Sequence, residues 1–212
     1  MIALDTAYMI TALVTMFVVV DPIAIAPLFI ALTSGMTQAQ RRRIAWRACV
    51  IAGVLLLIFA AFGKAVLGFI GISMPAFRVA GGILLFITAL DMLFDRRTKR
   101  REDRSTEEDD RHDPSAFPLA IPLIAGPGAI ASVILLTSER PGWEGFLTVS
   151  GITIFTLVVM GLTLQASGYL ERVLGKTLIN VITRLLGMLL AALSVQFVLD
   201  GLSAFGFGPT TG

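Results

Sequence analysis

Two proline-containing interruptions and one carboxylate are the features of this sequence best suited to chemistry. Asp21 and Pro22 lie well inside a long apolar run and Pro27 follows them, whereas Gly126-Pro127-Gly128 interrupts a second apolar run. Proline removes a backbone donor and clashes with the preceding turn, so we expect both runs to form broken helices. A half-helix that begins at such a break offers free N–H groups and a positive dipole end, which suit the carboxylate of a bound solute.

Asp21 has two interpretations, and they are compatible. Aspartate is a favoured N-cap and proline a favoured first residue, so Asp21 would cap a half-helix that begins at Pro22. A carboxylate inside a bilayer is costly and marks a functional site by default, so Asp21 would bind a substrate, an ion or a proton. Gly126 occupies the corresponding position of the second run, which confines any role of charge to one half.

Three further residues complete the candidate site. Ala24 lies within the first interruption and Ser132 follows the second. Gln196 lies deep in the last apolar run, where it would either form a hydrogen bond between helices or line a pathway. The sequence leaves both roles of Gln196 open.

Other chemistries are poorly represented in the composition. Cys49 is the single cysteine and lies in an apolar run, and the single histidine, His112, lies in the most polar stretch. We therefore predict no metal site and no cofactor. Asp21 has no paired carboxylate in the other half and no GxxxxGK[ST] loop is present, so we expect neither an enzyme nor an ATP-driven protein. The mildly basic net charge of +2 does not imply nucleic-acid binding.

The elements that position these residues are predicted to be transmembrane helices. The chain is 56% hydrophobic and 15% charged, with a mean hydropathy of +0.84, whereas soluble domains carry about 25% charged residues. A bilayer core of ~30 Å needs roughly 20 apolar helical residues. Six runs meet this length, which predicts an all-α membrane protein with the lipid bilayer as its partner. The runs are Ala7–Leu32, Trp46–Ile70, Pro75–Phe94, Ala116–Ser138, Phe146–Leu170 and Thr177–Phe205.

The distribution of the 17 basic residues predicts an orientation. Nearly all of them lie in the connections between runs one and two, three and four, and five and six; the exceptions are Lys64, Arg78 and Arg140. Short cytoplasmic loops carry the excess of Lys and Arg. We therefore expect a multi-pass protein of the bacterial inner membrane with both termini in the periplasm.

The two halves of the chain resemble each other. Pro22–Ala26 recurs as Pro127–Ala131, and Arg78–Gly81 recurs as Arg184–Gly187 at nearly the same offset. The predicted organisation is a first repeat of residues 1–94, a charged cytoplasmic linker of residues 95–115, and a second repeat of residues 116–212. Because each repeat has three spans, the repeats are inverted, as in many secondary transporters.

The two interruptions also carry a family resemblance. The segment from Val19 to Thr33 resembles the first-helix signature of the MarC family, and the segment from Ala120 to Ile130 resembles its fourth-helix signature. Ala24 departs from the glycine that is common there. The resemblance covers essentially the whole chain and implies a six-span inner-membrane protein related to neutral amino-acid transporters. The motif positions that it carries over are Asp21, Pro22, Pro27, Gly126, Pro127 and Gly128.

The function expected from these observations is secondary transport of a small zwitterionic solute such as glycine, alanine or serine, coupled to H⁺ or Na⁺. The alternative is a non-transporting membrane assembly or partner protein. A cavity that converges on residues 21–28 and 126–132 would favour transport, and dry packing of these segments would favour the alternative. The sequence does not determine the oligomeric state.

Overall fold

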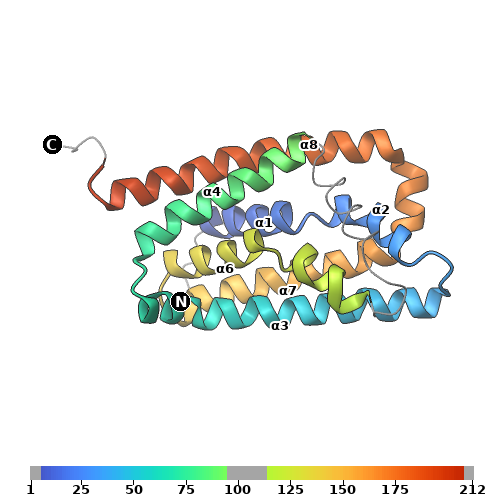
Figure 1. Cartoon of the computed structure of the whole chain (residues 1–212), viewed down its shortest axis with the longest axis horizontal. Coiled ribbons are helices and arrows are strands. Elements are labelled where there is room, and N and C mark those ends of the chain that lie inside the picture. The colour runs from blue at the N-terminus through green and yellow to red at the C-terminus, as the bar shows by residue number, and fades with distance from the viewer. Residues whose placement is uncertain (1–5, 95–113, 208–212) are drawn as a thin grey trace.

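The computed structural model describes residues 6–94 and 114–207, and every regular element in these ranges is a helix (Figure 1). The predicted linker, residues 95–115, and His112 therefore lie almost wholly outside the described residues, although Ser115 already begins a helix. The elements are α1 (Thr6–Val20), α2 (Pro22–Leu32), α3 (Gln38–Ile70), α4 (Met74–Leu93), η1 (Ser115–Ile124), α6 (Pro127–Glu139), α7 (Trp143–Gln165) and α8 (Ser167–Ala204).

Five helical segments are long and apolar enough to cross a membrane, and a bent pair of helices provides a sixth. The pair is η1 and α6, which meet at an angle of 54°. The five segments are Thr6–Leu32, which joins α1 to α2, Gln38–Ile70, Met74–Leu93, Trp143–Gln165 and Thr177–Ala204. The prediction of an all-α membrane protein is thus confirmed, with five spans or six when the bent pair is counted as one.

Local capping explains where the helices begin and end. Thr37 and Gln40 form a capping box at the start of α3, in which each side chain accepts a hydrogen bond from the other residue's backbone N–H. Ser73 caps α4 through the N–H of Ala76, and Gly71 ends α3 with a φ of 84°, a conformation that glycine adopts without strain. The capping box starts α3 well before the predicted Trp46, so the arginines that follow Gln40 belong to a helix.

The fifth and sixth predicted runs also need a correction at their junction. The fifth run was expected to reach Leu170, but α7 ends at Gln165 and α8 begins at Ser167. The segment around Arg172 is therefore helical rather than a loop. Gly175, with φ of 66° and ψ of 163°, interrupts α8 just before the candidate span that begins at Thr177.

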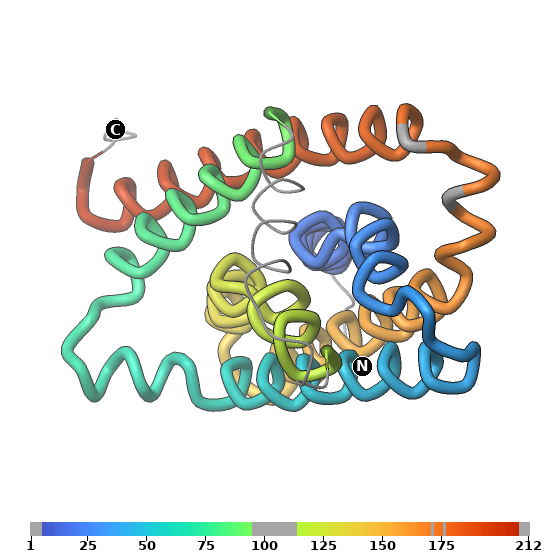
Figure 2. The backbone as a smooth tube through the Cα atoms, turned by 45° about the vertical axis from the view of Figure 1, so that its right-hand side comes forward, coloured from blue at the N-terminus to red at the C-terminus, as the bar shows by residue number. Residues whose placement is uncertain are grey.

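The helices form three layers (Figure 2). The helix pairs α1–α2 and η1–α6 lie in the centre. Helices α3 and α7 pack against each other on one side of this centre, and α4 and α8 pack along each other on the other side. The buried hydrophobic cluster draws on every span and is centred on these inner helices, with Met16, Ile25, Phe29, Leu119 and Leu135 among its fully buried members.

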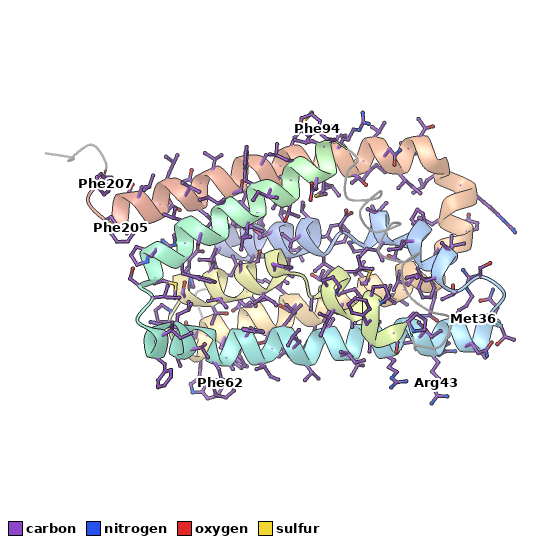
Figure 3. All side chains as sticks on the ribbon, viewed as in Figure 1. Met36, Arg43, Phe62, Phe94, Phe205 and Phe207 are labelled. Carbon is purple, nitrogen blue, oxygen red and sulfur yellow. The ribbon has the colours of Figure 1, made fainter. Side chains whose placement is uncertain are left out.

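The outer faces are apolar, as a bilayer requires. On α3, Val50, Val54, Ile58 and Phe62 are exposed at intervals of one turn, and Phe62 points away from the bundle in Figure 3. Met36 and Arg43 lie at one end of the bundle and Phe205 and Phe207 at the other.

Candidate functional site

Asp21 joins α1 to α2 in a conformation that few residues adopt. Its φ is 53° and its ψ is 65°, in the left-handed region, where Asn and Asp are enriched among residues other than glycine. The Asp21 N–H donates to the carbonyl of Phe17 at 2.9 Å, and its Oδ1 accepts from the N–H of Ala24 at 3.3 Å. Asp21 is therefore the N-cap of α2, as one of its two interpretations predicted, and its side chain is fully buried.

Pro22 and Pro27 shape the helix that follows. Pro22 is the first residue of α2 and is buried, at a position where its missing N–H would have had no helical partner. Pro27 lies inside α2, where it cannot donate to the carbonyl of Ile23. Ala24 is partly buried and contributes the N–H that Asp21 binds. The first interruption, Asp21 to Ala24, is thus a single turn built around one carboxylate.

The second interruption, Ile124 to Pro127, joins η1 to α6 at an angle of 54°. Gly126 is the N-cap of α6 and Pro127 is its first residue. A Cβ atom on Gly126 would lie 2.6 Å from the carbonyl oxygen of Pro122, a distance that real Cβ atoms do not adopt. Glycine is therefore required where the chain turns from η1 into α6.

The structure brings the two interruptions together at Gly128. A Cβ atom on Gly128 would lie 3.3 Å from Cγ1 of Val19, which is two residues before Asp21. The same atom would lie 3.4 Å from Cδ2 of Leu85 and 3.4 Å from Oγ1 of Thr88, both on α4. The first turn of α6 thus packs against the last turn of α1.

Ser132 and Gln196 have different surroundings. Ser132 is fully buried on α6, and its hydroxyl donates to the carbonyl of Gly128 at 2.8 Å. Gln196 is exposed on α8 and donates to Oδ1 of Asp200 at 2.7 Å, within its own helix. Gln196 also lines a cavity of about 320 Å³ between α1 and α8, together with Thr15. The structure therefore places Ser132 next to the second interruption and Gln196 in the wall of a separate cavity.

Helix α7 contributes polar residues that the sequence analysis missed. The hydroxyls of Ser150, Thr153 and Thr156 are buried and have no hydrogen-bond partner among the described residues. Thr148 and Thr163 of the same helix instead donate to the carbonyls four residues earlier. Buried polar atoms are rarely left unpaired, and each exception calls for an explanation. Their spacing of three residues, which places them on one face of the helix, could have indicated this polar row, but they lie in an otherwise apolar run.

Helix α7 packs along both α1 and α2, so its buried face runs past the first interruption. The described residues contain no group of three or more His, Cys, Asp or Glu side chains that would hold a metal ion. Of the two cavities described, one is lined by Gln196 and the other by Arg41 and its neighbours, and neither is lined by residues 21–28 or 126–132.

These features define the class of the protein: a polytopic helical membrane protein with five candidate spans, or six when the bent pair η1–α6 is counted as one. The chain belongs to the MarC family, because the family described as MarC family integral membrane protein matches residues 6–205.

Similar proteins occur in archaea and bacteria. A UPF0056 membrane protein of Methanocaldococcus jannaschii is 38% identical over 193 residues, which cover 89% of this chain and 84% of that protein. The UPF0056 membrane protein YhcE of Escherichia coli is 37% identical and YvbG of Bacillus subtilis is 35% identical; the alignments cover 88% of both chains for YhcE, and 92% of this chain and 94% of YvbG. No solved structure matches the chain.

Proposed function

We propose that this protein is a secondary transporter of a small zwitterionic solute, a neutral amino acid, in the bacterial inner membrane. The observation that carries the proposal is the contact of Gly128 with Val19. Gly128 lies in the first turn of α6, at the positive end of that helix dipole, and Val19 lies two residues before the buried Asp21. A zwitterion carries a carboxylate, which suits the positive end of the helix dipole, and an ammonium group, which suits the Asp21 carboxylate.

The packing of the helices supports an inverted repeat. The second helices of the two halves, α3 and α7, pack together, and so do the third helices, α4 and α8. Helix α4 also packs on α6, and α8 packs in the equivalent manner on α2. Each outer helix thus supports the half-helix of the other repeat. In transporters built from inverted repeats, the substrate site lies at the interface between the repeats.

The proposed site uses the three groups of polar atoms described above. The N–H groups at the start of α6 bind the solute carboxylate, and the Asp21 carboxylate binds its ammonium group or the coupling H⁺ or Na⁺. The hydroxyls of Ser150, Thr153 and Thr156 line the path through which the solute moves. Under this proposal, the described conformation, in which Asp21 and these hydroxyls are buried, would be one that is closed to the solute at both ends.

The proposed orientation places both termini in the periplasm. The first three turns of α3 carry Arg41, Arg42, Arg43 and Arg47, and the cytoplasmic ends of spans are the ones enriched in arginine. Helix α1 begins and α8 ends toward the other end of the bundle (Figure 1).

One observation favours the alternative function, a non-transporting assembly or partner protein. Residues around both interruptions are tightly packed, and neither cavity described above reaches them. A scaffold protein would need no more than this packing. A transporter must in addition open a path to the interruptions, which only a transport measurement detects.

Uptake of radiolabelled glycine, alanine and serine into proteoliposomes, under an imposed H⁺ or Na⁺ gradient, tests the proposal. We expect gradient-dependent uptake by the wild-type protein and its loss in Asp21→Asn. Asp91→Asn is the matched control, because Asp91 is a partly exposed carboxylate near the end of α4. Absence of uptake for all three solutes in the wild-type protein would reject transport of these amino acids. Coupled uptake that persists in Asp21→Asn would reject the role of the carboxylate.

A further inference from the structure

A basic cavity of about 650 Å³ lies where the first turns of α3 meet the last turn of α7. Its wall includes Arg41, Arg42, Arg43, Trp46, Leu164 and Gln165. Three consecutive arginines thus line a cavity, and the lining residues that the structure describes include no carboxylate. The positive end of the α3 dipole adds to the same field, because the cavity begins at Gln38, the first residue of α3. The cavity is therefore suited to an anion.

The Arg41 side chain is anchored by two contacts, but one of its hydrogen-bond donors has no acceptor. Its Nε donates to Oγ1 of Thr33 at 2.9 Å, and its guanidinium carbon lies 5.7 Å from the centre of the Phe29 ring. Its second terminal nitrogen, Nη2, is buried and has no hydrogen-bond partner among the described residues. A buried charged donor without an acceptor is costly, so an acceptor oxygen in this cavity would remove a penalty. Arg42 and Arg43 are exposed, and Arg43 points outward in Figure 3.

The apolar part of the wall continues onto the lipid-facing surface. The Trp46 ring packs on Gly161 of α7, where an added Cβ would lie 3.1 Å from Cζ3. One turn further along α3 come Val50, Val54 and Ile58, which are 62%, 54% and 49% exposed. Along α3, a basic cavity is thus followed by an interfacial tryptophan and then by an apolar stripe, an order that fits an anion with an attached acyl chain. A free phosphate ion would use only the first of the three.

We propose that the cavity binds the phosphate headgroup of an anionic phospholipid, with an acyl chain lying along the exposed stripe of α3. Arginine suits a phosphodiester because its planar guanidinium donates two parallel hydrogen bonds. Basic pockets between transmembrane helices are known headgroup sites. The proposal does not depend on transport activity.

Native mass spectrometry of the full-length protein in detergent, titrated with phosphatidylglycerol and with phosphatidylcholine, tests the proposal. We expect one tightly bound phosphatidylglycerol and no comparable phosphatidylcholine. Each basic residue near an anionic headgroup contributes about 1 kcal/mol, so the Arg42→Gln/Arg43→Gln variant should bind phosphatidylglycerol roughly thirtyfold more weakly. The Arg172→Gln/Arg184→Gln variant is the matched control, because it removes the same charge from exposed positions on α8.

Three results would overturn the proposal. An equal loss in the control variant would show unspecific attraction to the whole basic end. Displacement of the lipid by excess inorganic phosphate, together with no effect of Trp46→Ala, would show a site for free phosphate. Binding that appears only after the acidic residues between Glu102 and Asp113 are neutralised would show that the chain's own acidic segment occupies the cavity.

Discussion

The Tyr8 hydroxyl donates a 2.7 Å hydrogen bond to the carbonyl of Leu136 and so ties the first helix of the chain to α6. The guanidinium carbon of Arg140 lies 5.0 Å from the centre of the Tyr8 ring. This contact joins the two interrupted spans at one end of the bundle, while Gly128 and Val19 join them near the interruptions.

Loss of the Tyr8 hydroxyl should therefore weaken the fold slightly. We expect Tyr8→Phe to lower the free energy of unfolding by about 1 kcal/mol, the usual contribution of one hydrogen bond. Thermal unfolding in detergent, followed by circular dichroism, measures the effect. Tyr169→Phe is the matched control, because Tyr169 is 72% exposed and should tolerate the change. Equal shifts in the two variants would show that the Leu136 contact contributes nothing.

A larger residue at Gly128 should separate the two interruptions. A side chain there meets Val19, Leu85 and Thr88 within 3.4 Å, so we expect Gly128→Leu to lower the stability by about 1–3 kcal/mol, as overpacking does. Gly151→Leu on α7 is the control, since nothing lies within 4 Å of a Cβ at that position. Thermal unfolding of the two variants compares them directly, and an unchanged Gly128→Leu protein would contradict the described packing.

Substitutions at Asp21 should distinguish its role as a helix cap from its proposed role as a charged group in transport. Asn keeps an oxygen acceptor for the Ala24 N–H and tolerates the left-handed conformation. Ala provides neither property, so we expect Asp21→Ala to lose about 1–2 kcal/mol of stability and Asp21→Asn to lose much less. Unfolding measurements on both variants test the capping role. A stable Asp21→Asn protein without coupled transport would then assign the charge itself to function.

The hydroxyls of α7 should matter for transport more than for stability. Val has nearly the shape of Thr, and the Thr153 and Thr156 hydroxyls have no partner to lose among the described residues. We therefore expect the Thr153→Val/Thr156→Val variant to unfold at the same temperature or higher. Solute uptake by this variant should fall at least about tenfold, which is the effect of 1.4 kcal/mol. Thr163→Val, which removes a hydroxyl bonded to Val159, is the control for both measurements.

Much of the fold could be predicted because the deciding interactions are local. Apolar length identified the spans, and the preference of proline for the first helical residue placed the start of α2 at Pro22. The capping of α2 by Asp21 involves only residues three apart. The start of α3 was misplaced because the hydropathy of the arginines outweighed the Thr37–Gln40 capping box.

The sequence by itself determined that this chain crosses a membrane repeatedly, and where its spans are interrupted. Only the tertiary structure decided that α3 pairs with α7 and α4 with α8, and that Gly128 lies beside Val19. The physical reason is that lipid tails are as apolar as neighbouring side chains, so hydrophobicity does not distinguish an inner face from an outer one. On α3, Val50 faces outward and Ala52 is fully buried. The packing of small residues against distant segments determines which face of the helix is buried.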